Sequence, residues 1–134
     1  MKSILVAVVV LILAVGAMTW WALESGGVAT LETRDPSGGM RRTHVWFAEP
    51  DGEIWLEAGT PENAWFRDVQ EDPTVILRAD ERTDRYVARP GYEPEGHHRI
   101  RSLMREKYGF RDVWVGLLFD TERSVGVRLE PDPP

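Results

Sequence analysis

The sequence predicts a mainly β domain of the α+β class, in which six antiparallel strands form a small, partly open barrel with helices on its flank. Three observations predict this class. Short stretches of alternating apolar and polar residues follow one another, separated by turn residues. Stretches with helical spacing interrupt them, and an uncharged N-terminal segment precedes them all. Closing the strands into a barrel removes the sheet edges that many short strands would otherwise leave exposed.

The N-terminal segment, residues 4–23, is a run of 20 uncharged residues that would be about 30 Å long as a helix, the thickness of a hydrocarbon core. Trp20 and Trp21 end it where an aromatic belt lies at the headgroups. We therefore expect a single-pass anchor, with the lipid bilayer as the partner of residues 4–23. The alternative is a cleaved signal peptide, with Val15 and Ala17 at the small-residue cleavage positions.

Charge and composition limit the partners of the chain. The anchor and a polar, flexible linker occupy residues 1–27, and one domain occupies residues 28–134. Positive charge is nearly balanced between Lys2 on one side of the anchor and Arg34 on the other, and we expect the domain on the extracytoplasmic side. The chain has no cysteine, which excludes disulfides and thiolate sites. Its formal net charge of −6 disfavours a nucleic-acid partner.

Three strands are predicted in succession at the start of the domain. Residues 28–34 alternate in polarity and end at the turn sequence "DPSGG". Residues 42–49 and 53–59 flank a tight turn at residues 50–52, "PDG". Because the connections are short, we expect an antiparallel meander.

A short helix is predicted over residues 60–72. Thr60 is the expected N-cap and Pro61 the first helical residue, while Trp65 and Val69 recur at the spacing of one helix face. The helix must end before Pro73, which begins the approach to the next strand.

The remaining elements follow the same logic. Residues 74–80 and 85–92 are predicted strands joined at residues 81–84. Residues 93–109 form a helix with Gly109 as its C-cap. Its apolar face is expected to comprise Ile100, Leu103, Met104 and Tyr108. Two further stretches complete the chain: residues 110–120 as a second helix or an apolar connector, and residues 123–131 as the last strand.

Several motifs, taken in order, resemble a known family. They are "TRDPSGGMRRTHVWF", then "IWLEAG" followed by "ENAWFRDVQEDPTVIL", then "MREKYG". From about residue 30 to residue 130 the chain resembles the FMN- and deazaflavin-binding split β-barrel family, which is pyridoxamine-phosphate-oxidase-like, and within it the deazaflavin-dependent nitroreductase and quinone-reductase branch. The resemblance implies a six-stranded split barrel.

The resemblance also implies a cofactor, either a deazaflavin coenzyme of the F420 type or FMN, lying between the second strand and the turn after the third. The residues that would contact it are Arg42, Thr43, His44, Val45, Trp46, Ala58, Gly59, Thr60 and Trp65. An arginine can bind a phosphate through two hydrogen bonds, and a glycine lets backbone approach a ligand. No catalytic side chain is implied, because the cofactor ring carries the hydride chemistry.

Two functions from different classes are compatible with these features. The first is a membrane-tethered oxidoreductase that passes hydride from the cofactor to a quinone or a nitro-aromatic acceptor. A homodimer would favour neither hypothesis: split barrels often complete the cofactor cleft across a two-fold interface, and the apolar face of residues 110–120 is either such an interface or part of the core. The second is a non-catalytic envelope protein that uses the barrel to bind a protein or an apolar ligand. The acidic composition and the lack of lysine in the loop after the third strand favour the second.

Simpler structural interpretations exist for the most conspicuous residues. Arg41 and Arg42 are neighbours in a strand and point to opposite faces, so one faces a pocket at most and the other is solvated. His97 and His98 lie about 100° apart on a helix, which does not suit one shared metal ion, and we expect no metal site. The tryptophans are expected to pack in the core or against helices; they are Trp46, Trp55, Trp65 and Trp114.

Overall fold

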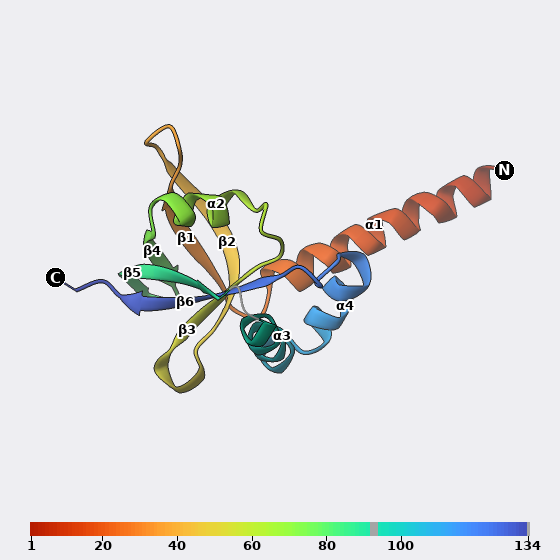
Figure 1. Ribbon diagram of the computed structural model, residues 1–134. Coiled ribbons are helices and arrows are strands. Elements are labelled where there is room, and N and C mark those ends of the chain that lie inside the picture. The colour runs from red at the N-terminus through yellow and green to blue at the C-terminus, as the bar shows by residue number, and fades with distance from the viewer. Residues whose placement is uncertain (92–93, 134) are drawn as a thin grey trace.

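The computed structural model describes residues 1–91 and 94–133, and in it six strands form one closed antiparallel barrel (Figure 1). The strands are β1 (Val28–Arg34), β2 (Met40–Ala48), β3 (Ile54–Ala58), β4 (Thr74–Ala79), β5 (Arg82–Gly91) and β6 (Val125–Pro131). Their order around the barrel is β1-β2-β3-β6-β5-β4. The predicted six-stranded split barrel is confirmed. The ring is closed where a partly open one was expected, because β1 also pairs with β4 from Thr30↔Arg78 to Glu32↔Ile76.

The helices lie outside the barrel. They are α1 (Lys2–Glu24), α2 (Ala64–Glu71), α3 (Pro94–Tyr108) and α4 (Phe110–Leu118), with one 3-10 turn, η1 (Pro50–Gly52), between β2 and β3. Figure 1 shows α1 projecting from the barrel, with α4 beside its C-terminal part and the end of the chain on the opposite side of the molecule. Residues 110–120, which the sequence left open between a helix and a connector, form a helix over most of their length.

Two apolar clusters hold these layers together. The barrel interior is filled by inward-facing strand residues such as Leu31, Leu56 and Val127, together with Trp65 and Phe66 of α2. A second cluster lies under α3 and consists of Ala48, Ile100, Leu103, Met104 and Tyr108, with Trp46 and Trp55 packed against it. The predicted apolar face of the helix over residues 93–109 is therefore confirmed.

Several element boundaries differ from the prediction, among them the start of α2. The helix α2 begins at Ala64 with Asn63 as its N-cap, three residues later than expected. The reason is a turn in which the Asn63 N–H donates to the Thr60 carbonyl at 3.2 Å, so Thr60 precedes the helix and does not cap it. A prediction that Tyr92 ends a strand and that residue 93 begins a helix falls outside the described residues.

The hairpin between β4 and β5 is also tighter than predicted. Its turn occupies residues 80–81, where Asp80 adopts a left-handed backbone conformation (φ 53°). Ala79 therefore pairs directly with Arg82, and residues 82–84 belong to the strand. Aspartate tolerates this conformation better than most residues, which permits the short turn.

The ladder between β2 and β3 is short, so the barrel wall has a gap between these two strands beyond the paired residues. It joins Phe47 to Leu56 and Ala48 to Trp55, whereas β1 and β2 pair along the whole of β1. The first part of β2 therefore diverges from the end of β3. The gap between the two strands is the split in the barrel, and residues of both strands line the largest cavity at this gap.

The N-terminal helix α1 is long and apolar enough to cross a membrane. Its last turn contacts the domain, and so do the residues that follow it. The Trp46 indole donates to the Leu23 carbonyl at 2.9 Å, and the Tyr108 hydroxyl donates to the Gly27 carbonyl at 2.8 Å. A side chain at Gly26, where φ is +86°, would meet the Tyr108 ring at 3.2 Å, so glycine is needed for this tight connection.

Candidate functional site

The largest cavity, of about 680 Å³, lies at the split of the barrel. This volume is in the range of small-molecule sites. Its walls come from β2, the end of β3, the start of α2, the end of α1 and the C-terminal part of α4. The lining residues are Leu23, Glu24, Val28, Thr43, His44, Val45, Trp46, Glu57, Gly59, Thr60, Asn63, Ala64, Trp65, Val115, Phe119, Asp120 and Thr121.

The structure places the predicted site residues in three positions. Seven of the nine line this cavity: Thr43, His44, Val45, Trp46, Gly59, Thr60 and Trp65. Ala58 is fully buried in the barrel core behind them. Arg42 lies on the outer face of β2, with a side chain 73% exposed, and lines a neighbouring depression with Thr30, Glu32, His44 and Arg78. His44 lines both hollows, so the two are neighbours on either side of that residue.

Arg42 and Arg78 share one carboxylate at the depression. Each donates its Nε–H to Oε1 of Glu32 at 3.0 Å. Hydrogen bonding from Arg78 contributes most to lowering the pKa of Glu32, against the opposing effect of its burial. Two guanidinium groups against one carboxylate leave an excess of positive charge beside the cavity. The Arg42 side chain is 73% exposed and the Arg78 side chain 49%, so both can reach a further anion.

The neighbouring Arg41 points to the other face, as the strand alternation predicted, but it is not simply solvated. Its Nε–H donates to Oδ2 of the buried Asp68 at 2.8 Å, and the Thr33 hydroxyl donates to the same oxygen at 2.7 Å. Asp68 lies on α2, so these contacts fix α2 against the barrel. Residues 64 and 65 of the same helix form part of the cavity wall.

The charge inside the cavity is mainly negative. Among the described residues, the lining includes the carboxylates of Glu24, Glu57 and Asp120 and no arginine or lysine. Nδ1 of His44 lies 2.9 Å from Oε2 of Glu24, which joins β2 to the end of α1. Exposed cationic partners for an anionic group lie beyond His44, where Arg42 and Arg78 line the depression.

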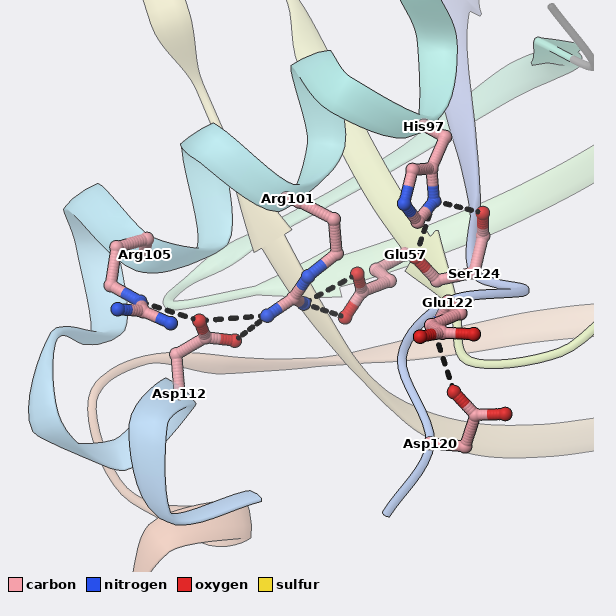
Figure 2. Close-up of polar contacts among 8 residues, drawn as sticks. All are labelled: Glu57, His97, Arg101, Arg105, Asp112, Asp120, Glu122 and Ser124. Carbon is pink, nitrogen blue, oxygen red and sulfur yellow. Dashed lines mark hydrogen bonds and ion pairs between the residues drawn. The ribbon is translucent and has the colours of Figure 1, made fainter. Parts of the chain in front are cut away.

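Glu57 is a candidate residue that the sequence reasoning missed. It accepts two hydrogen bonds from Nη1 of Arg101, at 2.7 and 3.0 Å, while Nη2 of Arg101 donates to Asp112 at 2.6 and 2.7 Å. Figure 2 shows Arg101 between the two carboxylates, with Arg105 reaching Asp112 from the next turn of α3. Burial raises the pKa of Glu57, and the attraction of Arg101 opposes this effect. The cavity therefore has a fixed, largely buried carboxyl group in its wall.

His97 extends the same cluster to the start of β6. Its Nδ1 lies 2.8 Å from the Ser124 carbonyl, which makes Nδ1 the donor, and 3.2 Å from the Ser124 hydroxyl (Figure 2). The His97 ring therefore connects α3 to Ser124, the residue before β6, by a hydrogen bond, and it is not simply a solvated group at the start of a helix. His98 stands edge-on to it, with the ring centroids 5.6 Å apart.

The tryptophans pack as the sequence suggested. Trp65 is buried in the barrel core, and Trp46 stacks on Tyr108 with ring centroids 4.0 Å apart. The Trp114 indole donates to the Thr19 hydroxyl at 3.1 Å, which attaches α4 to α1. Trp46 and Trp65 also present part of their surface to the cavity. Trp46 and Trp65 therefore belong both to the apolar clusters and to the wall of the cavity.

Comparison with known proteins gives information on the fold. No protein-family model matches the chain, and no curated protein matches it. Among solved structures, a conserved hypothetical protein from Mycobacterium tuberculosis is similar over 88% of this chain and 80% of its own, with 25% identity and a TM-score of 0.63. An F420 reductase is similar over 84% of this chain and 91% of its own, with 16% identity and a TM-score of 0.60.

A third similar structure is a Listeria innocua protein with a provisional assignment as a pyridoxamine 5′-phosphate oxidase. The similarity covers 84% of this chain and 89% of that one, with 14% identity and a TM-score of 0.59. The chain therefore shares the fold of these proteins, which is the six-stranded split barrel that the sequence resemblance implied.

Proposed function

We propose that the protein is an oxidoreductase that binds a deazaflavin coenzyme or FMN in the cavity at the split of the barrel. The observation that carries the proposal is the position of the cavity. It is formed where β2 diverges from β3, and seven of the nine residues that the family resemblance selected line it. The similar structures include an F420 reductase, which supports the same class of chemistry.

The residues present suit such a cofactor in two parts. The aromatic and aliphatic walls formed by Val45, Trp46 and Trp65 suit a flat ring system. Beyond His44, the excess positive charge of Arg42 and Arg78 suits a phosphate or an anionic tail. When bound, the cofactor ring would supply hydride transfer. The chain would supply the binding, orient the ring and exclude water from it.

The acceptor follows from the proposed attachment to a membrane. With α1 as an uncleaved single-pass anchor, the domain would remain at the bilayer surface, on the extracytoplasmic side that we expect for it. A lipid-soluble quinone is then the acceptor we favour, with a nitro-aromatic compound as the second choice. The homodimer stays a prediction.

A second candidate function is favoured by the charge of the cavity. With three carboxylates in the lining and no arginine or lysine among its described residues, the cavity suits a neutral or apolar ligand better than an anionic ring. A non-catalytic barrel that holds an apolar ligand, or binds a protein, would use the same walls without a cofactor. Cofactor titration separates the two functions.

The test is a titration of the full-length protein in detergent with FMN and with the deazaflavin coenzyme, followed by fluorescence. We expect micromolar binding of one of them. The variant Arg42→Ala should weaken that binding about tenfold or more, the scale of one lost charge-assisted contact. The same variant leaves Glu32 bonded to Arg78, so the barrel should stay folded.

The chain offers a matched control. Arg89 is also exposed on the outer face of a strand and donates its Nε–H to a glutamate, Glu130, at 3.1 Å. Glu130 keeps Arg128 when Arg89 is removed. Arg89→Ala should therefore bind the cofactor like the wild type. Equal losses in both variants, or no binding of either cofactor up to millimolar concentration, would overturn the proposal and favour the non-catalytic barrel.

A further inference from the structure

The helix α4 has an apolar face that the described part of the protein does not cover. Leu117 is 75% exposed, Phe110 59%, Phe119 52% and Leu118 47%. Large apolar side chains exposed together in this way form a substantial apolar surface that has no cover in the described part of the protein. From Val113 to Phe119 the sequence contains no charged residue.

The helix that carries this face packs against α1. Trp114 reaches Thr19 of α1, and Arg111 reaches Ser25, where its Nε–H donates to the hydroxyl at 2.6 Å. Since the higher-numbered residue on α4 meets the lower-numbered residue on α1, the two helices run antiparallel. Figure 1 shows α4 lying beside the C-terminal part of α1. Leu117 and Leu118 lie about one turn beyond Trp114, roughly 5 Å nearer the N-terminal end of α1.

Tryptophan and arginine side chains near the C-terminal end of α1 indicate the depth at which lipid headgroups would lie. Trp20 and Trp21 are 69% and 44% exposed at its C-terminal end. The Arg111 guanidinium lies 4.4 Å from the centre of the Trp21 ring, at the same level. Tryptophan and arginine are the side chains that anchor a helix at lipid headgroups. The exposed leucines of α4 are on the apolar side of this level.

We propose that α4 is a second membrane contact: its exposed residues, from Leu117 to Phe119, insert into the outer part of the leaflet that α1 enters. This second contact rests on the proposed function, in which α1 attaches the protein to a membrane. Lipid is the occupant because the helix that carries this apolar face packs against α1, whose own apolar surface is exposed. The opposite end of α4 carries Arg111, which suits anionic headgroups.

The consequence concerns access to the cavity. Leu23 of α1 and Val115 and Phe119 of the α4 segment are part of its lining. When α4 is inserted in the outer part of the lipid leaflet, this wall of the cavity lies next to the acyl chains. The substrate class of the site is then an apolar molecule dissolved in the bilayer, which reaches the cavity from the lipid.

Site-specific fluorescence tests the proposal directly, because the chain has no cysteine. The full-length variants Leu117→Cys, Val10→Cys and Pro133→Cys would each be labelled with an environment-sensitive dye and placed in nanodiscs of phosphatidylcholine and phosphatidylglycerol. Val10 is the anchor position, within α1, and Pro133 is an exposed residue that follows β6. Quenching by spin-labelled lipid and by aqueous iodide would then be compared.

We expect lipid quenching at Leu117 close to that at Val10 and several-fold above that at Pro133. Quenching at Val10 alone would keep the anchor and overturn the inserted α4. A Leu117 probe shielded from both quenchers would also overturn it, since a protein surface such as a second copy would then cover the face. No lipid quenching at Val10 would remove the membrane attachment itself, and the inference with it. Cofactor titration is independent of all these outcomes.

Discussion

Glu57 lies in the cavity wall, and the fold shifts the pKa of its carboxyl group. Its pKa is raised because burial disfavours the charged form, although Arg101 opposes this. Between the ordinary value of 4.5 and the raised value, the folded state binds more protons at Glu57 than the unfolded state does. The free energy of unfolding must therefore fall as pH rises through that window.

The pH dependence is tested by comparison with Glu57→Gln, which cannot ionise at this position. As pH rises from 4.5, the free energy of unfolding of the wild type should fall relative to that of the variant, and the difference should become constant above the raised pKa. Denaturant titrations at a series of pH values, followed by tryptophan fluorescence, measure this difference. A wild type that gains stability relative to the variant would mean that the attraction of Arg101 outweighs burial and lowers the pKa of Glu57.

Arg101 is the residue on which the buried charges depend. It bridges Glu57 and Asp112, whose side chains are 11% and 1% exposed. Arg101→Ala would leave buried carboxylates poorly paired, which should lower the free energy of unfolding by about 3–5 kcal/mol. The control is Arg105→Ala: this side chain is 61% exposed, and Asp112 keeps Arg101, so its loss should cost less than about 1 kcal/mol. Similar losses in both variants would contradict the central role of Arg101.

At the scale of elements, glycines set how closely α3 approaches the barrel. A side chain on Gly126 of β6 would come within 2.9 Å of the Gly96 carbonyl oxygen and 3.1 Å of Cβ of Ile100. Gly126→Ala should therefore push α3 outward and lower the free energy of unfolding by about 1–3 kcal/mol. The stability of Gly116→Ala, where no atom lies within 4 Å, should be unchanged or higher by up to about 1 kcal/mol. Chemical denaturation of the two variants distinguishes close packing from a general effect of removing glycine.

Element boundaries were predictable where one local signal dominated. The bounds of β1 matched the prediction, since alternation and the following turn residues both mark them. The start of α2 did not, because Thr60 and Asn63 are both acceptable caps and the turn between them decides. The β4–β5 turn was missed because it depends on a left-handed Asp80, which no spacing rule reports. The short apolar run of α4 gave no period that could separate a helix from a connector.

At the scale of the whole molecule, the six-stranded antiparallel barrel could be anticipated but the site only in part. Contacts distant in sequence complete the cavity wall: Arg101 meets Glu57 across 44 residues, and Trp46 meets Leu23 across 23. Residues 1–27 were expected to be anchor and linker, and no pattern in the sequence indicated that the end of α1 lines the cavity. Such pairings arise from the packing of α1, α3 and α4 outside the barrel, and local patterns do not encode them.

The cavity at the split of the barrel is proposed as the cofactor site, and filling it with a bulky side chain should block binding. Ala64 lines the cavity and is exposed, so Ala64→Trp should occupy the space without disturbing the core. Arg67, exposed on the same helix, is not among the lining residues, and Arg67→Trp is the control.

The measurement is the equilibrium titration of these two full-length variants and the wild type with FMN and with the deazaflavin coenzyme. We predict that the wild type and Arg67→Trp bind one cofactor alike, while Ala64→Trp loses at least about tenfold in affinity. Cofactor binding that is equally strong in Ala64→Trp would contradict the proposed site, because the cofactor would then bind outside this cavity.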